Sequence, residues 1–243
     1  MKDYLGALRN PRFIREFLQD SARILRRAGV AAASSYILDR LIGVHPAVLR
    51  ARGRGDTAVV RARVDAFPGA RMNLDWEDAG ISRDLLLHGT REEAAGAFFR
   101  RALRPGHVVV DAGANIGWYV LMEAAIVGPA GRIVAIEPGP RNYELLKQNI
   151  ALNGFGDRVA AVHGALAAAS GTATLHLARQ SNLHTLQRTA GMEGYVQFDG
   201  VVEVQALTMD ELVQQHGIEP ADVNVVRMDV EGFEVDVFAG MQR

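Results

Sequence analysis

The chain has 243 residues, of which 49% are hydrophobic and 23% are charged. This is an ordinary globular composition, and the length suits one enzyme-sized domain with an appendage. The sequence contains no cysteine, which excludes a disulfide framework, a thiol nucleophile and a zinc or iron–sulfur site built on cysteine. No apolar stretch is long enough to span a bilayer, and none opens the chain as a signal peptide does, so we expect a cytoplasmic protein.

The net charge of −1 conceals an uneven distribution of charge along the chain. Residues 1–54 contain 11 basic and 4 acidic residues, whereas residues 55–243 contain 16 basic and 24 acidic residues. A basic arm on an acidic body suggests that the arm contacts something anionic. The candidates are a membrane surface, a nucleic acid and the acidic body itself, and of these we do not expect the nucleic acid. If the arm binds lipid, the protein is peripheral to the inner face of the membrane.

The first part of the chain is predicted to form a basic helical arm over residues 1–54 and a pre-core hairpin over residues 55–90. Asn10-Pro11 is typical of a helix start, and apolar residues then recur at helical spacing. The hairpin has two expected strands, residues 59–64 and 71–76, with a proline-glycine turn between them.

From residue 91 to residue 243 the pattern changes to apolar strands that alternate with helices. The expected strands are short, and two of them end in an acid: residues 107–111, 132–137, 159–162, 172–177, 201–207 and 223–228. Helices are expected between them, over residues 91–103, 116–127, 140–152, 208–217 and 233–241. Apolar strands separated by helices predict a parallel sheet that helices cover on both faces. The fold class is therefore α/β, with a doubly wound sheet.

The strongest functional signal is the run Val108–Gly117, VVVDAGANIG, in which a strand leads into a glycine-containing turn and then a helix. Gly113 and Gly117 let the backbone approach a ligand closely, and the helix start behind them offers free N–H groups. A doubly wound fold binds its nucleotide-like ligand at this turn. The alternative is a tight strand–helix turn without a ligand. The spacing is not the G-x-G-x-x-G pattern of dinucleotide sites, which argues against a nicotinamide-dependent oxidoreductase.

Glu137 ends the second core strand, 20 residues after Gly117. An acid in this place in a doubly wound fold hydrogen-bonds the hydroxyl pair of a ribose. Because the carboxyl ends of parallel strands meet at one edge of a sheet, Glu137 should face the same crevice as the glycine turn. We therefore favour ribose binding over a solvated acid that merely precedes Pro138.

A third signal lies where another apolar strand ends, in the segment MDVEG. Asp229 and Glu231 in this segment could hold a substrate hydroxyl or accept its proton. Glu231 could equally favour the following helix start through the helix dipole. His184 lies between the cofactor and substrate motifs and is a further candidate base, although a plain surface histidine is the simpler interpretation. The seven histidines show no metal-ligand spacing, so no metal is expected.

Together these motifs resemble the FkbM-like family of S-adenosylmethionine-dependent methyltransferases, over roughly residues 74–241. The matching segments are VVVDAGANIGWY, AIEPGPRNYELLKQNIALNG, VEVQALTMDEL and VRMDVEGFE, with Glu92 ahead of Arg104-Pro105-Gly106. The resemblance implies a Rossmann-like methyltransferase fold, S-adenosyl-L-methionine as the cofactor, and O-methylation of sugars, polyketides or other hydroxylated metabolites. The basic arm lies outside it.

The resemblance also implies a role for each motif. The glycine turn would line the methionine end of the cofactor through Asp111, Gly113, Asn115 and Gly117. Glu137 would bind the ribose hydroxyls. Asp229 and Glu231 would face the acceptor, which is expected to be a hydroxyl of a small molecule or a glycan.

One departure from the family pattern concerns the end of the core. Complete domains of this type continue with a fifth strand and a closing hairpin, whereas this chain stops at Arg243, one helix past the fourth core strand. We therefore expect a fragment or a truncated product whose C-terminal strands are missing. Such a product exposes an apolar sheet edge and would self-associate through it. A non-catalytic or partner-dependent remnant that binds the cofactor poorly is the alternative function.

Overall fold

The chain contains two compact units, one formed by residues 1–65 and 69–91 and the other by residues 66–68 and 92–243. The sequence predicted boundaries after residue 54, between the arm and the hairpin, and after residue 90, between the hairpin and the core, and both stay predictions. The computed structural model describes these parts of the chain: residues 11–42, 59–75, 77–78, 80–187 and 196–242.

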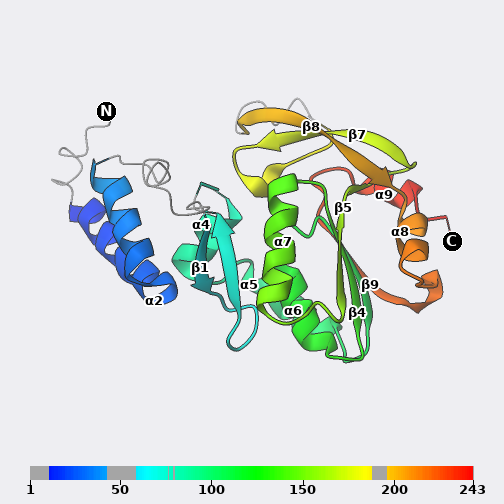
Figure 1. Cartoon of the computed structure of the whole chain (residues 1–243), viewed down its shortest axis with the longest axis horizontal. Coiled ribbons are helices and arrows are strands. Elements are labelled where there is room, and N and C mark those ends of the chain that lie inside the picture. Colours follow the sequence, from blue (N-terminus) through cyan, green and yellow to red (C-terminus); the bar gives the residue numbers. More distant parts are fainter. Residues whose placement is uncertain (1–10, 43–58, 76, 79, 188–195, 243) are drawn as a thin grey trace. The chain divides into compact units, whose positions relative to one another are not determined.

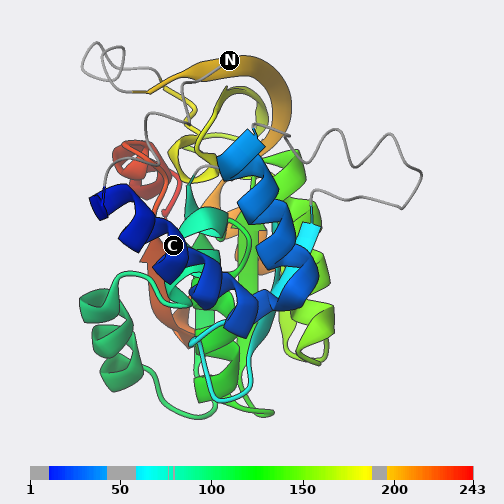
Figure 2. The same cartoon turned by 90° about the vertical axis from the view of Figure 1, so that its left-hand side faces the viewer.

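The first unit begins with a long helix that folds back on itself. Helix α2 (Pro11–Ile42) starts at the predicted proline and breaks at Gly29, whose φ of 83° is not helical. The two halves of α2 lie against each other (Figures 1 and 2). The ring of Tyr36 stacks on Phe17, and its hydroxyl donates to Asp20 at 3.0 Å. Only glycine adopts a positive φ at little cost, so Gly29 is the position where the helix can reverse.

The rest of the first unit is a hairpin and a short helix. Strands β1 (Val59–Arg63) and β2 (Arg71–Asp75) pair in antiparallel register, which confirms the predicted hairpin strands. Helix α4 (Ile81–His88) follows, and the sequence analysis did not anticipate it. Residue 76, predicted as the end of the return strand, lies outside the described residues.

The second unit is built on a parallel sheet of four strands in the order β5-β4-β3-β9. The four strands are β3 (Val108–Ala112), β4 (Arg132–Glu137), β5 (Val159–His163) and β9 (Val223–Met228). Strand β9 pairs with β3 in a register that sets Asp111 beside Arg227. The sheet confirms the predicted doubly wound α/β class, and it confirms that the last apolar strand lies beside the first.

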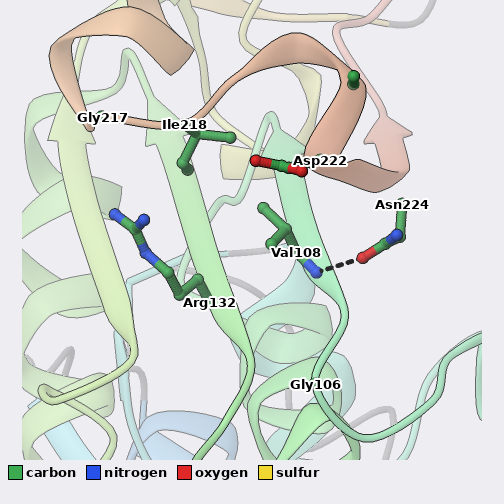
Figure 3. A pocket seen from close by; sticks show the side chains of 8 residues that line it. Gly106, Val108, Arg132, Gly217, Ile218, Asp222 and Asn224 are labelled. Atoms are coloured by element: carbon green, nitrogen blue, oxygen red, sulfur yellow. Dashed lines mark hydrogen bonds between the residues drawn. The ribbon is translucent and has the colours of Figure 1, made fainter.

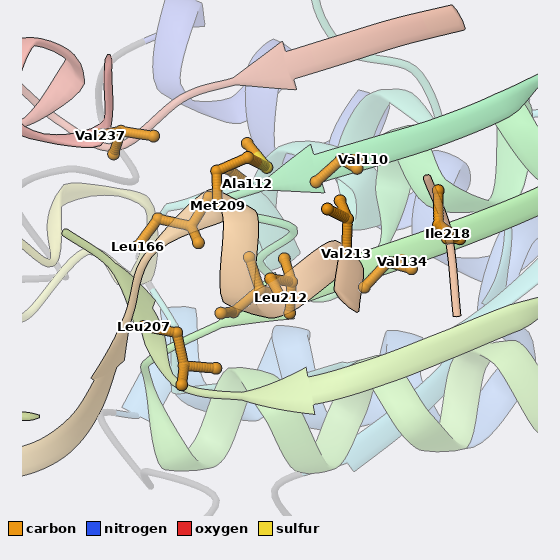
Figure 4. Packing of buried hydrophobic residues seen from close by; sticks show 11 residues of the cluster. Val110, Ala112, Val134, Leu166, Leu207, Met209, Leu212, Val213, Ile218 and Val237 are labelled. Atoms are coloured by element: carbon orange, nitrogen blue, oxygen red, sulfur yellow. The ribbon is translucent and has the colours of Figure 1, made fainter. Parts of the chain in front are cut away.

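Helices cover both faces of this sheet (Figure 1). On one face lie α6 (Trp118–Val127) and α7 (Pro140–Leu152), with α5 (Glu93–Ala102) packed against α6. On the other face lie α8 (Met209–Gln215) and α9 (Glu234–Ala239). Figure 4 shows the core between this second face and its helices, which includes Val110, Ala112, Val134, Leu166, Met209, Leu212, Val213 and Val237.

Local chemistry sets the ends of these elements. Helix α8 begins at a capping box in which Thr208 and Glu211 each accept the other's backbone N–H. Helix α7 begins with Pro140, where the missing N–H of proline costs nothing. Strand β3 is buried along nearly its whole length, which is why its sequence is an apolar run without alternation.

A second sheet, of three strands, lies at the carboxyl edge of the first. Its strands are β6 (Ala165–Leu166), β7 (Gly171–Ala178) and β8 (Phe198–Leu207), in the order β6-β8-β7. Strands β7 and β8 form an antiparallel hairpin that arches over the four-stranded sheet (Figure 1). The 3-10 helix η1 (Ser181–Leu183) follows β7, and a second one, η2 (Pro220–Asp222), precedes β9.

Strand β9 pairs on one side only among the described strands, so its other side is an edge of the four-stranded sheet. The truncation expected after this strand stays a prediction. Within the part of the chain that the structure describes, no helix has the length and apolar character to cross a membrane.

Candidate functional site

Three strand ends meet at the carboxyl edge of the four-stranded sheet and bring the predicted site residues together. Gly113 N donates to Ile136 O at 3.0 Å, which ties the glycine turn to the end of β4. Asp229 N donates to Ala112 O at 3.0 Å, which ties the loop after β9 to the other side of the turn. The turn therefore lies between Glu137 and Asp229, as the predicted strand order requires.

The backbone of the glycine turn explains its small residues. Gly113 has a φ of 78°, and a Cβ on it would overlap the carbonyl oxygen of Asp229. Gly117 has a φ of 92° and begins α6. Asn115 has a φ of 50°, a left-handed conformation that asparagine tolerates better than most residues. The spacing of the motif thus follows from the shape of the turn, which keeps the backbone open to a close approach by a ligand.

Glu137 is buried at the end of β4, and donors from three residues hold its carboxylate. Asn115 N donates to Oε2 at 2.8 Å, Gly139 N donates to Oε1 at 2.8 Å, and Asn142 Nδ2 donates to Oε1 at 3.3 Å. Burial raises the pKa of Glu137 to about 7, although these donors act to lower it. The carboxylate is therefore oriented in advance, but it is partly protonated at neutral pH.

The segment after β7 lies across Glu137 and its neighbours. Ser181 O accepts hydrogen bonds from the side-chain amides of Asn115 and Asn142, both at 3.2 Å. A Cβ added to Gly139 would lie 2.9 Å from Cδ2 of His184. Residues 181–184 therefore pack against the residues that surround Glu137.

The hydrogen bond of His184 limits what its ring can do. His184 Nδ1 accepts from Ala178 N at 3.0 Å, so the neutral ring carries its proton on Nε2. A ring in this tautomer donates from its outer nitrogen rather than accepting a proton there. The catalytic role predicted for His184 stays a prediction, and this geometry makes it a weaker candidate base than an exposed carboxylate.

A buried arginine links the glycine turn to the loop after β9. Arg227 Nη1 donates to Asp111 Oδ1 at 2.8 Å, and Nη2 donates to Asp229 Oδ2 at 2.8 Å. The guanidinium lies 4.1 Å from the ring centroid of Tyr119, whose hydroxyl donates to Glu92 at 2.7 Å. The side chain of Asp111 is wholly buried, whereas that of Asp229 is 52% exposed. Asp229 is thus the end of this network that a substrate can reach.

The buried members of the network have perturbed pKa values. Burial raises the pKa of Asp111, and Arg227 acts in the opposite direction. Burial by itself would lower the pKa of Arg227, but Asp111 and Asp229 raise it above the ordinary value, so the guanidinium stays charged. Burial, together with the hydrogen bond to Glu92, raises the pKa of Tyr119, so the phenol stays neutral.

Glu231 lies in the loop between β9 and α9, close in sequence to Asp229. Its φ is 50°, and its carbonyl oxygen accepts from Thr185 Oγ1 at 3.1 Å, which joins this loop to the segment after η1. Helix α9 begins three residues later, at Glu234. The two roles predicted for Glu231, a contact with the acceptor and an effect on the start of α9, both stay predictions.

Arg227 was not among the predicted site residues, although the sequence carries a signal for it. Arg227 is the one charged residue of the strand VNVVRM, two positions before Asp229. Side chains two apart in a strand lie on the same face, so an arginine there belongs with the acid that follows it. Tyr119 carries no such signal, because its contacts come from other elements.

A pocket of about 340 Å³ opens at the opposite, amino-terminal end of the sheet (Figure 3). Two of its polar side chains have partners in the protein: Asn224 Oδ1 accepts from Val108 N at 2.7 Å, and Arg132 Nη2 donates to His216 O at 2.7 Å. Doubly wound sheets bind their ligands at the carboxyl ends of the strands. We therefore do not assign this pocket to the cofactor.

The residues at the carboxyl edge fit a nucleoside cofactor with an amino-acid tail. Oε1 of Glu137 accepts from Gly139 and Asn142, whereas Oε2 accepts from Asn115 alone and keeps a lone pair to which a ribose hydroxyl can donate. The turn at Gly113 and Asn115 is half-buried and carries no side chain larger than asparagine. The fold is that of a Rossmann-like α/β protein, and the carboxyl edge of its sheet suits a nucleoside ligand.

Comparison with known proteins identifies the family. Residues 111–243 match the family model of the methyltransferase FkbM domain, and the chain belongs to that family. Methyltransferase sdnD of Sordaria araneosa is 29% identical over 157 residues, which cover 55% of this chain and 60% of that protein. The 31-O-demethyl-FK506 methyltransferase FkbM of Streptomyces tacrolimicus is 28% identical over 162 residues, which cover 58% of this chain and 61% of that protein.

The chain thus spans about 60% of the length of these curated relatives. Among solved structures, TYW2 of P. horikoshii in complex with MeSAdo is 26% identical, with a TM-score of 0.33 over 45% of this chain and 37% of that one. Family membership confirms the expected cofactor, S-adenosyl-L-methionine. It favours neither a nicotinamide-dependent oxidoreductase nor a non-catalytic remnant.

The raised pKa of Glu137 predicts that cofactor binding depends on pH. A ribose diol donates to a carboxylate, so protonation of Glu137 at low pH weakens binding. With a pKa of about 7, we expect affinity for S-adenosylhomocysteine to fall about tenfold from pH 8 to pH 6. Glu137→Gln should bind S-adenosylhomocysteine about ten- to a hundredfold more weakly than the parent chain at pH 8. Because glutamine does not titrate, the fall in affinity between pH 8 and pH 6 should be absent from this variant. Calorimetry measures both, and unchanged affinity in the folded variant would remove Glu137 from the site.

Proposed function

We propose that this chain transfers a methyl group from S-adenosylmethionine to a hydroxyl oxygen of a small-molecule or glycan acceptor. The observation that carries the proposal is the position of Asp229. It is a half-exposed carboxylate on the far side of the glycine turn from Glu137. An acceptor hydroxyl that binds at Asp229 faces the same crevice as the cofactor, as methyl transfer requires.

The residues of the chain divide the work of binding, aligning and deprotonating. When bound, the cofactor supplies an electrophilic methyl group on a positively charged sulfur. Glu137 binds the ribose hydroxyls, and the turn at Gly113 and Asn115 holds the methionine end. Binding the cofactor and the acceptor side by side, with their reacting atoms aligned, removes most of the entropic cost of a bimolecular reaction. This alignment is the larger part of the rate acceleration that the protein has to provide.

Asp229 is the proposed general base. Arg227 holds its Oδ2 at 2.8 Å, and the same guanidinium is paired with the fully buried Asp111. The hydrogen bond to Arg227 uses Oδ2 of Asp229, and its other oxygen is the one proposed to accept the proton of the acceptor hydroxyl. An alcohol becomes a good nucleophile only as its proton leaves, and a positioned base typically contributes about 10²–10⁴-fold.

The names of the relatives support an oxygen acceptor. Both are named methyltransferases, and the name of the Streptomyces relative describes its substrate as 31-O-demethyl-FK506. By this likeness the acceptor of the present chain is a hydroxylated metabolite. Glu231 is then a further contact to the acceptor, and His184 is the next candidate for the base.

The role of Asp229 predicts a specific kinetic change. Asp229→Asn keeps the shape and the contact with Arg227 but removes the basicity, so we expect turnover to fall by about 10²-fold or more. Affinity for S-adenosylhomocysteine should stay nearly unchanged, which is the pattern of a lost transition-state interaction. Glu231→Gln is the matched control and should have a smaller effect. If Asp229→Asn instead abolishes cofactor binding in a folded chain, Asp229 belongs to the cofactor pocket and His184 becomes the candidate base.

Helix α2 supports a second proposal, contact with an anionic membrane surface. Three apolar side chains of α2 are exposed: Ile14 by 38%, Leu18 by 60% and Leu25 by 47%. Leu18 and Leu25 lie four and eleven residues after Ile14, a spacing that puts all three on one face of the helix. Arginines flank this face along the first half of α2. A basic helix with an exposed apolar face lies on an anionic bilayer with that face inserted. The protein would then be cytoplasmic and peripheral to the membrane.

Vesicle co-sedimentation measures this contact. We expect the full chain to sediment with vesicles that contain anionic lipid, and less so as salt rises, because salt screens the attraction. Leu18→Ser should weaken sedimentation by removing apolar surface from the contact face. Equal sedimentation of the chain with neutral vesicles, or of a chain that lacks residues 1–54, would show that the arm is not the anchor.

The outer edge of β9 supports self-association of this chain. Strand β9 carries valines and has a partner strand on one side only among the described strands. Unpaired N–H and C=O groups along an apolar strand are a template for another chain. We expect light scattering of the purified chain to show species larger than a monomer. A monomer with a single sharp unfolding transition would contradict the proposal.

A further inference from the structure

A second buried acid lies next to Asp111. Glu123 is wholly buried in α6, a helix whose other residues are all apolar or aromatic. Among the described residues, no N–H or O–H donor reaches either oxygen of Glu123 or Oδ2 of Asp111. The two carboxyl groups lie within hydrogen-bonding reach of each other. Ionised carboxylates only accept hydrogen bonds, so a bond forms between them only if one of the pair keeps a proton.

The contacts of the pair indicate which of the two acids holds the proton. Asp111 Oδ1 lies 2.8 Å from Arg227 Nη1, a charge-assisted bond that favours the ionised form of Asp111. No ion pair within the described residues joins Glu123 to a cation. Burial, and then the negative charge of Asp111, raise the pKa of Glu123 well above its ordinary value. The proton therefore stays on Glu123.

The other ionisable groups around the pair agree with this assignment. Arg227 is the cation of the cluster, and it also contacts Asp229 on its exposed side. Glu92, the residue before α5, accepts a hydrogen bond from the hydroxyl of Tyr119, and the phenol stays neutral. An ionised Glu123 would add a second fully buried negative charge beside Asp111, with one guanidinium to balance both. A buried charge without a partner is strongly unfavourable, so the cluster is balanced only while Glu123 is protonated.

We infer that Glu123 is a positioning residue of the acceptor site: it donates a hydrogen bond to Oδ2 of Asp111 and, through Arg227, fixes the carboxylate of Asp229. The inference rests on the proposed function of Asp229 as the base. Arg227 donates to Oδ1 of Asp111, and Oδ2, which no other donor reaches among the described residues, accepts from the protonated Glu123. An aspartate held at both oxygens cannot turn, so it fixes the guanidinium whose second nitrogen holds Asp229 at 2.8 Å.

Infrared spectroscopy of the full chain detects the proton directly, because the C=O stretch of a carboxylic acid is separate from the amide and carboxylate bands. At pH 9 Glu137 is ionised, since its pKa is about 7, so an acid band at that pH reports on Glu123. We expect the band in the parent chain and in the control Glu137→Gln, and its loss in Glu123→Gln. Absence of the band from the parent chain, or its survival in Glu123→Gln, overturns the inference.

Turnover of two Glu123 variants separates positioning from packing. Glu123→Gln keeps a donor for Asp111, whereas Glu123→Met keeps the length of the side chain and removes the donor. A small misplacement of a reacting group by a distant mutation can cost about 10²-fold, so we expect Glu123→Met to lower kcat by about tenfold or more. Glu123→Gln should stay within about threefold of the parent chain, and both variants should bind S-adenosylhomocysteine as the parent does. Equal losses in the two variants would show a packing role and overturn the inference.

The failure of this inference and the failure of the proposed function are distinguishable. If Asp229 is not the base, kcat is unchanged in Asp229→Asn, whatever the infrared band shows. If Glu123 does not hold the proton, the infrared result shows it without any acceptor or any turnover. Should Glu123→Met not fold, the infrared comparison and Glu123→Gln still decide.

Discussion

The buried ion pair between Arg227 and Asp111 is the interaction on which the rest of the site depends. The two residues are opposite each other in the register of β9 and β3, and their side chains are 9% and 0% exposed. A buried pair adds little net stability compared with apolar residues, but loss of one partner typically costs about 3–5 kcal/mol. The main effect of the pair is therefore to fix the position of Asp229. It joins β9, which ends one residue before Asp229, to β3, which leads into the glycine turn.

The glycine turn lies between two carboxylates in contrasting surroundings. Glu137 is buried and is held by N–H donors from the glycine turn and from Gly139, whereas Asp229 is half-exposed and is held by a guanidinium. Gly113 makes this spacing possible, because any side chain there would meet the carbonyl of Asp229. In the proposed function, the buried acid binds the cofactor and the solvent-accessible acid meets the acceptor, which suits a transfer reaction between two bound molecules.

The elements of the core were predictable because their signals are local. Strand β4 matches the predicted residues 132–137, and the capping box at Thr208 begins α8 as predicted. The parallel order then implied that Glu137 and Asp229 lie at one edge. The network behind them was not predictable in the same way, because Arg227 and Asp111 are 116 residues apart and meet only through strand register. The reversal of α2 at Gly29 likewise depends on contacts between its two halves.

Helix α6 shows how an acid can occupy a position that would otherwise require an apolar residue. A helix that is apolar on all sides is buried on all sides, and an ionised glutamate within it would be very unfavourable. A protonated glutamate is uncharged and is also a donor, so it can satisfy the one oxygen of Asp111 that Arg227 does not reach. A lysine there would add a second cation and compete with Arg227 for Asp111. The neutral acid therefore completes the hydrogen bonding of Asp111 while leaving Arg227 free to hold Asp229.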